Sequence, residues 1–439
     1  MNLEQSTILK GNNNKGKDIF NLIEEMYPIC RSITGNGVRE TLSIISKVIP
    51  LSIHEIPSKT KALDWEVPLE WNINDAWIKN SKEEKIIDFK NCNLHVLNYS
   101  IPIHKKVTIK ELKEHLFTLP DYPDLVPYRT SYHNREWGFC ISHNQFQELN
   151  DDTYEVKIDS TLENGSLTYG EFFIKGESDD EVLISTHVCH PSLANDNLSG
   201  IAIATFIAES LNREKRIPKL SYRFLFIPAT IGSIVWLSLN EDKIKNIKHG
   251  LVLTLLGDNS TFNYKKSRRG NSIIDTIVEN CLKNSQENYK ILDFSPYGYD
   301  ERQFCSPGYN LPIGTLSRAI HGEFPEYHTS ADNLEFIHQE KLEESLDLII
   351  SIIRIIENNE TFINLCPKGE PQLGKRGLFK KIGGESETKD FQMALLWVLN
   401  QSDGENSLLD ISIKSKLNFD LIKKSADELV AVNLLQLIK

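Results

Sequence analysis

A short apolar run that ends in polar residues and leads into a helix constrains the fold of this 439-residue chain most strongly. Val182-Leu183-Ile184 is typical of a strand buried on both faces, and residues 201–211 are typical of a buried helix. Between them lie His187, His190 and the turn Asp196-Asn197-Leu198-Ser199-Gly200. In open α/β sheets, ligands bind beyond the carboxyl ends of the strands. We therefore expect a site at this strand end.

Two imidazoles and a carboxylate suit zinc or a similar divalent ion, because both groups are common ligands of that metal. The alternative is structural, with Asp196 as a helix N-cap beside a buried histidine. A third histidine, His328, stands in a polar loop before Leu334. The three histidines together favour the metal site.

Further apolar runs predict the rest of the sheet. Residues 222–227, 251–256 and 311–316 are expected to be strands, and residues 340–358 a long helix. Polar residues follow several of these strands, where a site would be built. The pattern predicts an α/β domain with a mixed, mostly parallel sheet and helices on both faces.

Changes in local composition and in the spacing of apolar runs predict three domains. Residues 56–125 alternate short apolar runs with Pro, Asn and Asp, which indicates a small β-rich domain inserted into an α/β domain of residues 1–55 and 126–365. After a linker at 359–385, three short helices and a β-like tail at 386–439 resemble a winged helix.

Near the N-terminus, Arg31-Ser32-Ile33-Thr34-Gly35-Asn36-Gly37 is expected to form a turn between two predicted helices, in which the glycines can take positive φ.

Composition narrows the classes of function. The net charge of −12 argues against general affinity for nucleic acids or anionic membranes. No stretch approaches the roughly 20 apolar residues that span a bilayer, and no signal peptide is visible. Seven cysteines without regular spacing are typical of reduced thiols. We expect a cytoplasmic protein.

The strand ends and loops offer more candidate side chains. Asp258 follows the run at 251–256, Asp300-Glu301-Arg302 stands in a loop, and Glu326-Tyr327-His328-Thr329 precedes Asp332. With the turn at 196–200 and His187, these segments resemble co-catalytic zinc aminopeptidases of the M28 type. The whole chain is similar to a bacterial group of aminopeptidase-like proteins with an inserted β-domain and a C-terminal winged helix, associated with polysaccharide biosynthesis.

The resemblance implies a zinc-exopeptidase-like fold, one or two zinc ions, and a role for each matching residue. Asp196 would bridge the metals, with His187 and Asp258 completing one site and His328 serving the other. The remaining expectations fall into two groups: substrate contacts, from Asp300, Arg302, Tyr327 and Glu326, and second-layer acceptors for the histidines, from His190 and Asp332.

One position departs from the family pattern. M28 enzymes carry a glutamate pair after the central strand, one as general base and one as ligand. Here the segment reads Ile227-Pro228-Ala229-Thr230, and no carboxylate lies between Ser221 and Asn240. An alanine neither accepts a proton nor binds zinc. Three explanations remain open: an engineered substitution, a natural pseudo-enzyme, or a base supplied by Glu301 or Glu326.

Two classes of function follow. The first is a zinc-dependent aminopeptidase-like hydrolase acting on a peptide or amide bond beside a free amine, with amide-forming transfer or cyclisation as a variant on the same scaffold. The second is a non-catalytic binding protein. We expect a small peptide-like or amine-bearing partner, no nucleic acid and no membrane. We expect the C-terminal block to serve packing or dimerisation, and in the second case the protein would be a homo-oligomer.

The C-terminal block provides a first test. From Thr388 onward it holds 6 Lys, no Arg and 7 Asp plus Glu, a poor electrostatic footprint for DNA. We expect no tight binding to duplex DNA in a fluorescence-anisotropy titration at physiological salt. Sequence-dependent binding at nanomolar concentration would contradict this expectation.

Overall fold

The computed structural model describes residues 15–132, 134–214, 216–285, 287–378 and 386–438. These residues form two compact units. The larger unit spans residues 15–275 and 287–347, and the smaller one residues 276–285 and 348–438, with the gaps just given. Residues 1–14 of the predicted α/β domain and 379–385 of the predicted linker lie outside the described residues.

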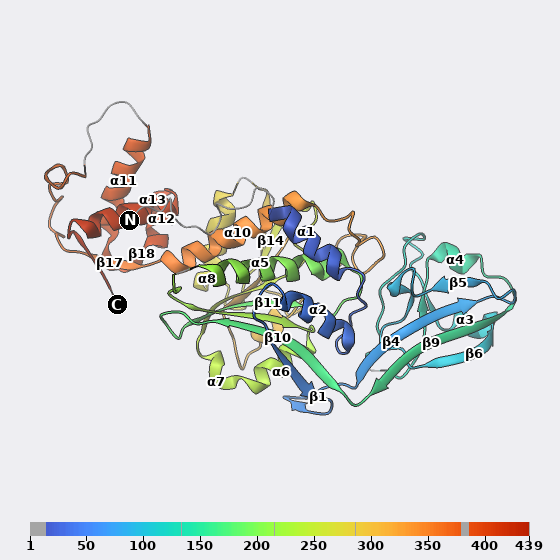
Figure 1. Cartoon of the computed structure of the whole chain (residues 1–439). Coiled ribbons are helices and arrows are strands. Elements are labelled where there is room, and N and C mark those ends of the chain that lie inside the picture. Colours follow the sequence, from blue (N-terminus) through green and yellow to red (C-terminus); the bar gives the residue numbers. More distant parts are fainter. Residues whose placement is uncertain (1–14, 133, 215, 286, 379–385, 439) are drawn as a thin grey trace. The chain divides into compact units, whose positions relative to one another are not determined.

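An eight-stranded mixed sheet forms the centre of the larger unit (Figure 1). Its order is β1-β10-β12-β11-β13-β16-β14-β15. The four central strands run parallel, whereas β10 and β14 are antiparallel to their central neighbours. The strands are β1 (Ser52–Pro57), β10 (Ser166–Ile174), β11 (Glu181–His187), β12 (Ser221–Ile227), β13 (Ile247–Leu253), β14 (Phe262–Lys265), β15 (Tyr289–Leu292) and β16 (Ile313–Ser317).

Helices cover both faces of the sheet, as the sequence predicts. Every residue of β11 and β12 is buried, so these strands need apolar layers above and below. In Figure 1, α1 (Lys15–Met26), α2 (Asn36–Ser46) and α5 (Gly200–Arg213) lie on one side, and α6 (Ile231–Leu239) and α7 (Glu241–Ile244) on the other. Helix α9 (Glu301–Phe304) belongs to the larger unit, whereas α8 (Ile273–Asn284) and α10 (Gln339–Asn358) each contain residues of both units.

The β-rich insert reaches further along the chain than the expected 56–125. Its four-stranded sheet has the order β5-β4-β9-β6, from β4 (Glu70–Lys79), β5 (Lys85–Asp88), β6 (Ile103–Thr108) and β9 (Thr153–Glu163). The polar-apolar alternation of β9 reads equally well as part of either domain, and its pairing with β4 decides the assignment. Shorter elements accompany it: β2 (Lys61–Ala62), β3 (Trp65–Glu66), α3 (Ile109–Lys113), β7 (Leu116–Phe117), β8 (Phe139–Cys140) and α4 (His143–Gln147).

The insert shares its core with the α/β sheet. One continuous cluster of buried apolar residues joins Trp71 and Val156 of the insert to Leu183, Leu225 and Trp236. A continuous apolar core fixes the two parts against each other.

The smaller unit contains a winged-helix arrangement, as the sequence predicts. Helices α11 (Ser386–Gln401), α12 (Leu408–Ser415) and α13 (Phe419–Ala431) accompany a three-stranded sheet of order β18-β17-β19. The strands are β17 (Thr361–Asn364), β18 (Asp403–Ser407) and β19 (Leu435–Leu437). Strand β17 lies inside the stretch expected to be a linker. The sequence did not reveal this strand, because the strands with which it pairs lie more than 35 residues further along the chain.

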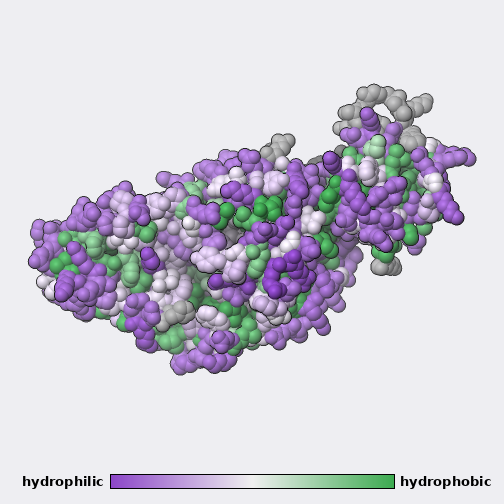
Figure 2. All heavy atoms as spheres, turned by 180° about the vertical axis from the view of Figure 1, so that it is seen from behind, coloured by the Kyte–Doolittle hydropathy of each residue, from purple (hydrophilic) through white to green (hydrophobic). Residues whose placement is uncertain are grey.

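The surface is mixed in character. Figure 2 shows a face on which hydrophilic residues predominate and hydrophobic ones gather in separate groups. Among the described residues, no helix combines the length and the apolar character that crossing a membrane requires.

A buried ion-pair cluster ties together three strands of the sheet and provides a stability test. Arg223 of β12 donates to both oxygens of Glu181 in β11, at 2.7 and 2.9 Å, and also pairs with Glu171 of β10. Removing one partner of a buried pair leaves an uncompensated charge. We expect Arg223→Ala to lower the free energy of unfolding by about 3–5 kcal/mol, measured by urea denaturation.

The matched control is Lys248→Ala. Lys248 lies 3.7 Å from Asp180, and both side chains are 48% exposed. Exposed pairs contribute about 0–1 kcal/mol. Equal losses in the two variants would show that the Arg223 cluster is not an organising feature of the sheet.

Candidate metal centre

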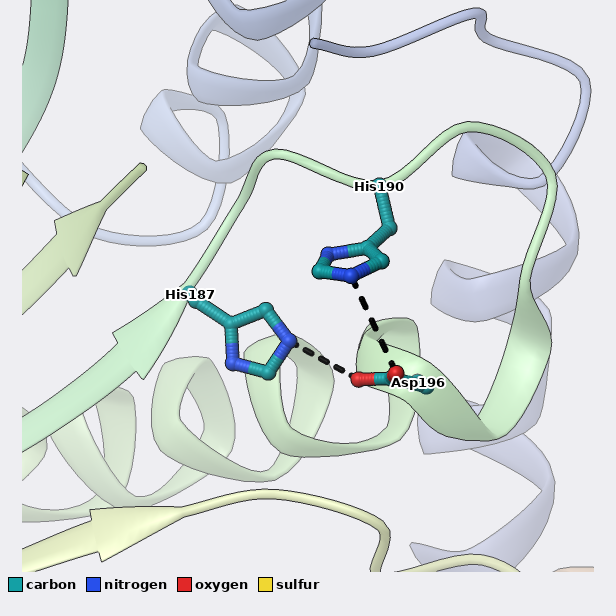
Figure 3. A group of neighbouring side chains, drawn as sticks. All are labelled: His187, His190 and Asp196. Carbon is teal, nitrogen blue, oxygen red and sulfur yellow. Dashed lines mark hydrogen bonds and ion pairs between the residues drawn. The ribbon is translucent and has the colours of Figure 1, made fainter. Parts of the chain in front are cut away.

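Two segments at the carboxyl edge of the sheet bring the histidines together with Asp196. His187 is the last residue of β11, and His190 follows three residues later. Asp196 lies in the turn Ala194–Ser199 that leads into α5. His328 comes from the loop after β16. Figure 3 shows the first two histidines directed at the carboxylate.

The Asp196 carboxylate is the centre of the group. Its Oδ1 lies 2.8 Å from His187 Nε2, and its Oδ2 lies 3.1 Å from His328 Nε2 and 3.8 Å from His190 Nε2. One ligand atom from each of His187, His190 and Asp196 lies within 4.8 Å of the others. Asp196 and His187 are almost wholly buried.

This geometry fits a divalent metal. Among the described residues, neither Asp196 Oδ2 nor His328 Nε2 has a partner with hydrogen-bond geometry, although they face each other. Buried polar atoms are usually paired, and an ion between these atoms would satisfy both. Imidazole nitrogens and carboxylate oxygens are the donor set that zinc accepts.

Aromatic rings hold the imidazoles in place. The Tyr128 ring lies 5.2 Å from that of His190 and 5.1 Å from that of His328, measured between centroids. Tyr299 stacks on His187 at 5.1 Å, and Tyr327 stacks on His328 at 3.9 Å. Each imidazole therefore has little freedom to rotate away from Asp196.

The His328 backbone is held from the insert side. Its φ is +55°, in the left-handed region, and its carbonyl accepts a hydrogen bond of 2.7 Å from the Tyr128 backbone N–H. A left-handed histidine persists only where its surroundings hold it. The contact with residue 128 contributes to holding it.

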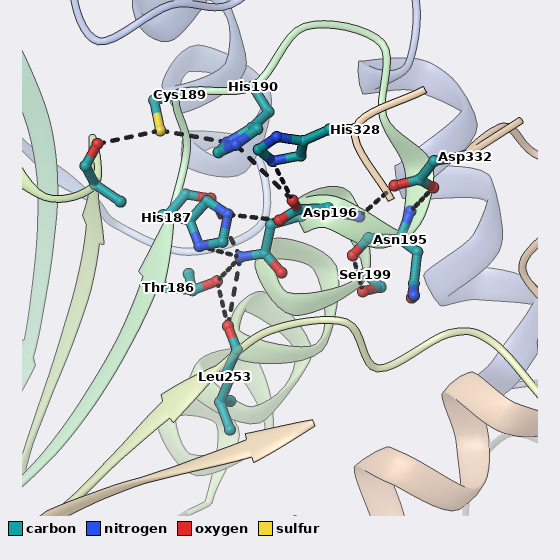
Figure 4. A network of polar contacts seen from close by, with 12 residues as sticks. Thr186, His187, Cys189, His190, Asn195, Asp196, Ser199, Leu253, His328 and Asp332 are labelled. Atoms are coloured by element: carbon teal, nitrogen blue, oxygen red, sulfur yellow. Dashed lines mark hydrogen bonds and ion pairs between the residues drawn. The ribbon is translucent and has the colours of Figure 1, made fainter. Parts of the chain in front are cut away.

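A second layer of polar groups orients the Asp196 turn (Figure 4). The Asp332 carboxylate accepts from the backbone N–H groups of Asn195 and Asp196, at 2.6 and 2.9 Å. The Asn195 amide in turn donates to Asp258 Oδ2 at 2.7 Å. The other Asp258 oxygen accepts from the Ser260 N–H. These bonds fix the carboxylate of Asp196 through its own backbone.

Asp258 stands beside the Asp196 turn, and its role as a metal ligand stays a prediction. Its oxygens are engaged by Asn195 and Ser260, and it does not belong to the group of mutually close ligand atoms. His190 was expected in the second layer, but its imidazole belongs to the group around Asp196. Asp332 does occupy the second layer, although it contacts the turn rather than a histidine.

Burial and charge shift the pKa values of these groups. Burial raises the pKa of Asp196, but the surrounding imidazoles, that of His190 first, outweigh it, so the pKa lies well below its usual range. Burial lowers the pKa of His190, which favours the neutral imidazole that binds metals. Burial, together with the charges of Asp196 and Asp258, raises the pKa of Asp332 to about 8.

Position 229 lies beside this cluster. Strands β11 and β12 are paired so that His187 faces Ile227, and Ala229 follows two residues later. The Ala229 carbonyl accepts from the Cys189 thiol at 3.7 Å. Burial raises the pKa of Cys189, so the thiol stays protonated.

Asp300 and Glu301, at the start of α9, differ in their surroundings. Asp300 is fully buried, and its Oδ1 accepts from the Ser233 hydroxyl at 2.8 Å. Burial raises its pKa to about 6. Glu301 is equally buried but forms an ion pair with Lys265. Arg302 is half-buried, and its Nε has no hydrogen-bond partner among the described residues.

The Glu326 side chain is half-buried in the loop that carries His328. Its carbonyl accepts hydrogen bonds from the backbone and hydroxyl of Thr329. These two bonds close a turn that contains His328. Glu326 and Tyr327 thus come from the same loop as His328.

The sequence patterns did not place Tyr128 or Arg31 in this region. Tyr128 stands in a segment with no ligand spacing, and Arg31 lies 159 positions from the His190 carbonyl that it contacts. Aromatic and cationic residues are common in any chain. Only their tertiary contacts identify these two.

Comparisons with known proteins agree with this architecture. Residues 20–359 match the family described as a domain of unknown function (DUF4910), and residues 360–437 match a winged helix-turn-helix family. A Clostridium acetobutylicum protein, provisionally named a polysaccharide biosynthesis protein with an aminopeptidase-like domain, is 55% identical over 435 residues. The match covers 99% of this chain and 100% of that protein.

Solved structures extend the comparison. A crystal structure from Clostridium acetobutylicum, provisionally named a peptidase, has a TM-score of 0.92 at 55% identity, over 96% of each chain. A zinc aminopeptidase from Bacillus subtilis has a TM-score of 0.55 at 14% identity, over 79% of this chain and 96% of that one. The second likeness shows a shared fold and confirms the predicted aminopeptidase-like architecture. The chain belongs to the DUF4910 family, with an aminopeptidase-like α/β domain followed by a winged helix.

Proposed function

We propose that the protein is a zinc-dependent, aminopeptidase-like hydrolase that acts on a peptide or amide bond beside a free amine. The observation that carries the proposal is the convergence of three imidazoles on the buried carboxylate of Asp196. The aminopeptidase-like fold and the related C. acetobutylicum protein support it. When bound, zinc supplies Lewis-acid polarisation of a carbonyl group and eases deprotonation of water.

The chain's own residues fall into distinct roles under this proposal. His187, His190, His328 and Asp196 hold the metal, and Asp332 orients the Asp196 turn through two backbone N–H groups. The Tyr299 ring stacked on His187 keeps that imidazole in position and shields it from water. These contacts preorganise the site before a substrate arrives.

The acidic groups favour a substrate with an ammonium group. Because Lys265 neutralises Glu301, the carboxylates left for this purpose are Asp300 and Glu326. The same ion pair makes Glu301 a poor general base, since its charge already has a partner. Of the two bases that the sequence suggested, Glu326 is the better placed, because it shares a loop with His328.

The second candidate function is a non-catalytic binding protein, and Ala229 is the observation that favours it. The alanine stands beyond the end of β12, next to the cluster, with a side chain that accepts no proton. Such a protein would bind the same metal and the same class of ligand without turnover.

Metal binding is the first test. We expect the purified protein to retain zinc after dialysis, held by His187, His190, Asp196 and His328. Asp196→Asn should remove most of the metal, because the amide cannot provide a charged bridge. Zinc content is measured by elemental analysis, and affinity by competition with a chelating dye.

The matched control is His104→Ala. His104 is an exposed histidine that pairs with Glu155, away from the cluster. Its replacement should leave the zinc content unchanged. A wild-type protein without affinity for any divalent ion would refute the proposed metal centre.

Position 229 is the second test. We expect weak or no activity on aminoacyl anilides as the chain stands, because the Ala229 side chain offers no proton acceptor beside the cluster. Ala229→Glu should raise kcat/KM by about 10²-fold or more, the contribution of a general base. The measurement is a steady-state assay with zinc present.

Ala229→Gln separates the base from the added volume, since glutamine has the same shape but accepts no proton at neutral pH. It should give no gain. Equal activity of the wild type and Ala229→Glu on a good substrate would show that the base lies elsewhere, with Glu326 next to be replaced.

A further inference from the structure

A fully buried arginine, Arg31, contacts the segment 188–193 that carries His190. This segment is called the metal loop below. Arg31 is 1% exposed, yet it stands outside the elements that carry the histidines. Burying a cation is costly unless its donors are satisfied. Such a residue therefore needs a reason for its position.

The guanidinium of Arg31 forms hydrogen bonds with the backbone of the metal loop. Its Nε donates to the His190 carbonyl at 2.7 Å, and its Nη2 donates to the Pro191 carbonyl at 2.8 Å. Its Nη1 donates to the Met26 carbonyl at the end of α1, at 2.7 Å. Two adjacent carbonyls of one loop thus share one rigid, planar donor group.

These contacts differ from an ordinary ion pair. The hydrogen bonds of the guanidinium go to three carbonyls and the Thr41 hydroxyl rather than to a carboxylate. Burial lowers the pKa of Arg31 to about 10, so the group is still charged at neutral pH. A planar fork that satisfies several carbonyls at once is a property of arginine that lysine lacks.

The opposite side of the same turn is attached to the β-rich insert. Asn98 of the insert accepts from the Ser32 hydroxyl and donates to the Arg31 carbonyl, the latter at 3.2 Å. The Thr34 hydroxyl lies 2.6 Å from the Tyr99 hydroxyl and accepts from the Trp71 N–H at 3.0 Å.

Gly35 completes the attachment. Its φ is +94°, and a Cβ at this position would collide with the Trp71 carbonyl. The turn at 31–37 therefore lies between the insert and the metal loop, in contact with both.

We propose that Arg31 is a positioning residue for the metal centre, and that the turn at 31–37 transmits support from the β-rich insert to His190. The proposal rests on the proposed zinc site and adds a role for the insert. Arg31 touches no metal and no substrate. It acts by fixing the backbone from which the His190 imidazole projects toward Asp196.

The test measures zinc affinity rather than activity. Arg31→Lys keeps the charge but loses the fork, so the zinc affinity should fall about 10-fold or more, as for other groups that orient metal ligands. The loss should vanish in a His190→Ala background, because Arg31 acts through that residue. Competition with a chelating dye gives both affinities, and circular dichroism confirms folding.

Two further variants distinguish a specific loss of zinc affinity from a general loss of stability. Arg318→Lys is the control for loss of a buried guanidinium: Arg318 is also 1% exposed and donates to a carbonyl, a hydroxyl and the Glu344 carboxylate, but contacts neither His190 nor Pro191. It should lower the melting temperature and leave the zinc affinity unchanged. Asn98→Ala, on the insert side, should weaken zinc binding in the same direction as Arg31→Lys, and it replaces that variant as the test if Arg31→Lys does not fold.

The outcomes separate the two proposals. Unchanged zinc affinity in Arg31→Lys, or an equal loss with and without His190, would overturn the role of Arg31 while the metal centre stands. Unchanged affinity in Asn98→Ala would overturn the role of the insert. A wild-type protein that binds no zinc would overturn this inference together with the proposed function.

Discussion

The buried carboxylate of Asp196 determines how the surrounding loops are arranged. An ionised group without solvent is strongly unfavourable unless charges and hydrogen bonds compensate it. Here the compensation comes from imidazoles on two separate loops, and the Asp332 carboxylate fixes the turn by accepting two of its backbone N–H groups. All of these groups stand at the carboxyl edge of four parallel strands. The sheet makes the cluster possible because its strands end side by side.

Much of the fold and part of the site could be predicted from the sequence. The central strands and α10 are apolar runs of the right length, and buried strands of a parallel sheet carry a strong pattern. His187 and Asp196 were identifiable because the strand, the turn and the helix are contiguous. The extent of the insert was not, since the place of β9 depends on pairing with β4 across more than 70 residues.

The positions of His190, Asp258 and Arg31 show a second limit. A motif gives the residue types near a metal, but the layer in which each side chain lies depends on a few ångströms of loop geometry. Asp258 is directed at Asn195, and His190 is directed at Asp196, because of bonds made by their neighbours. Neither outcome leaves a trace in local periodicity. Arg31 is more remote still, because its partners are carbonyls, which any residue could provide.

The left-handed backbone conformation of His328 costs stability, and the imidazole at this position is needed for the proposed site. Asparagine and glycine adopt a φ of +55° more readily than histidine does, so either would relieve local strain at this position. Selection for folding alone would thus drift away from histidine here, and only a requirement for the imidazole would oppose that drift. Position 328 therefore reports on function in any close relative. A relative that keeps the fold but has no need of the imidazole would be expected to lose this histidine early.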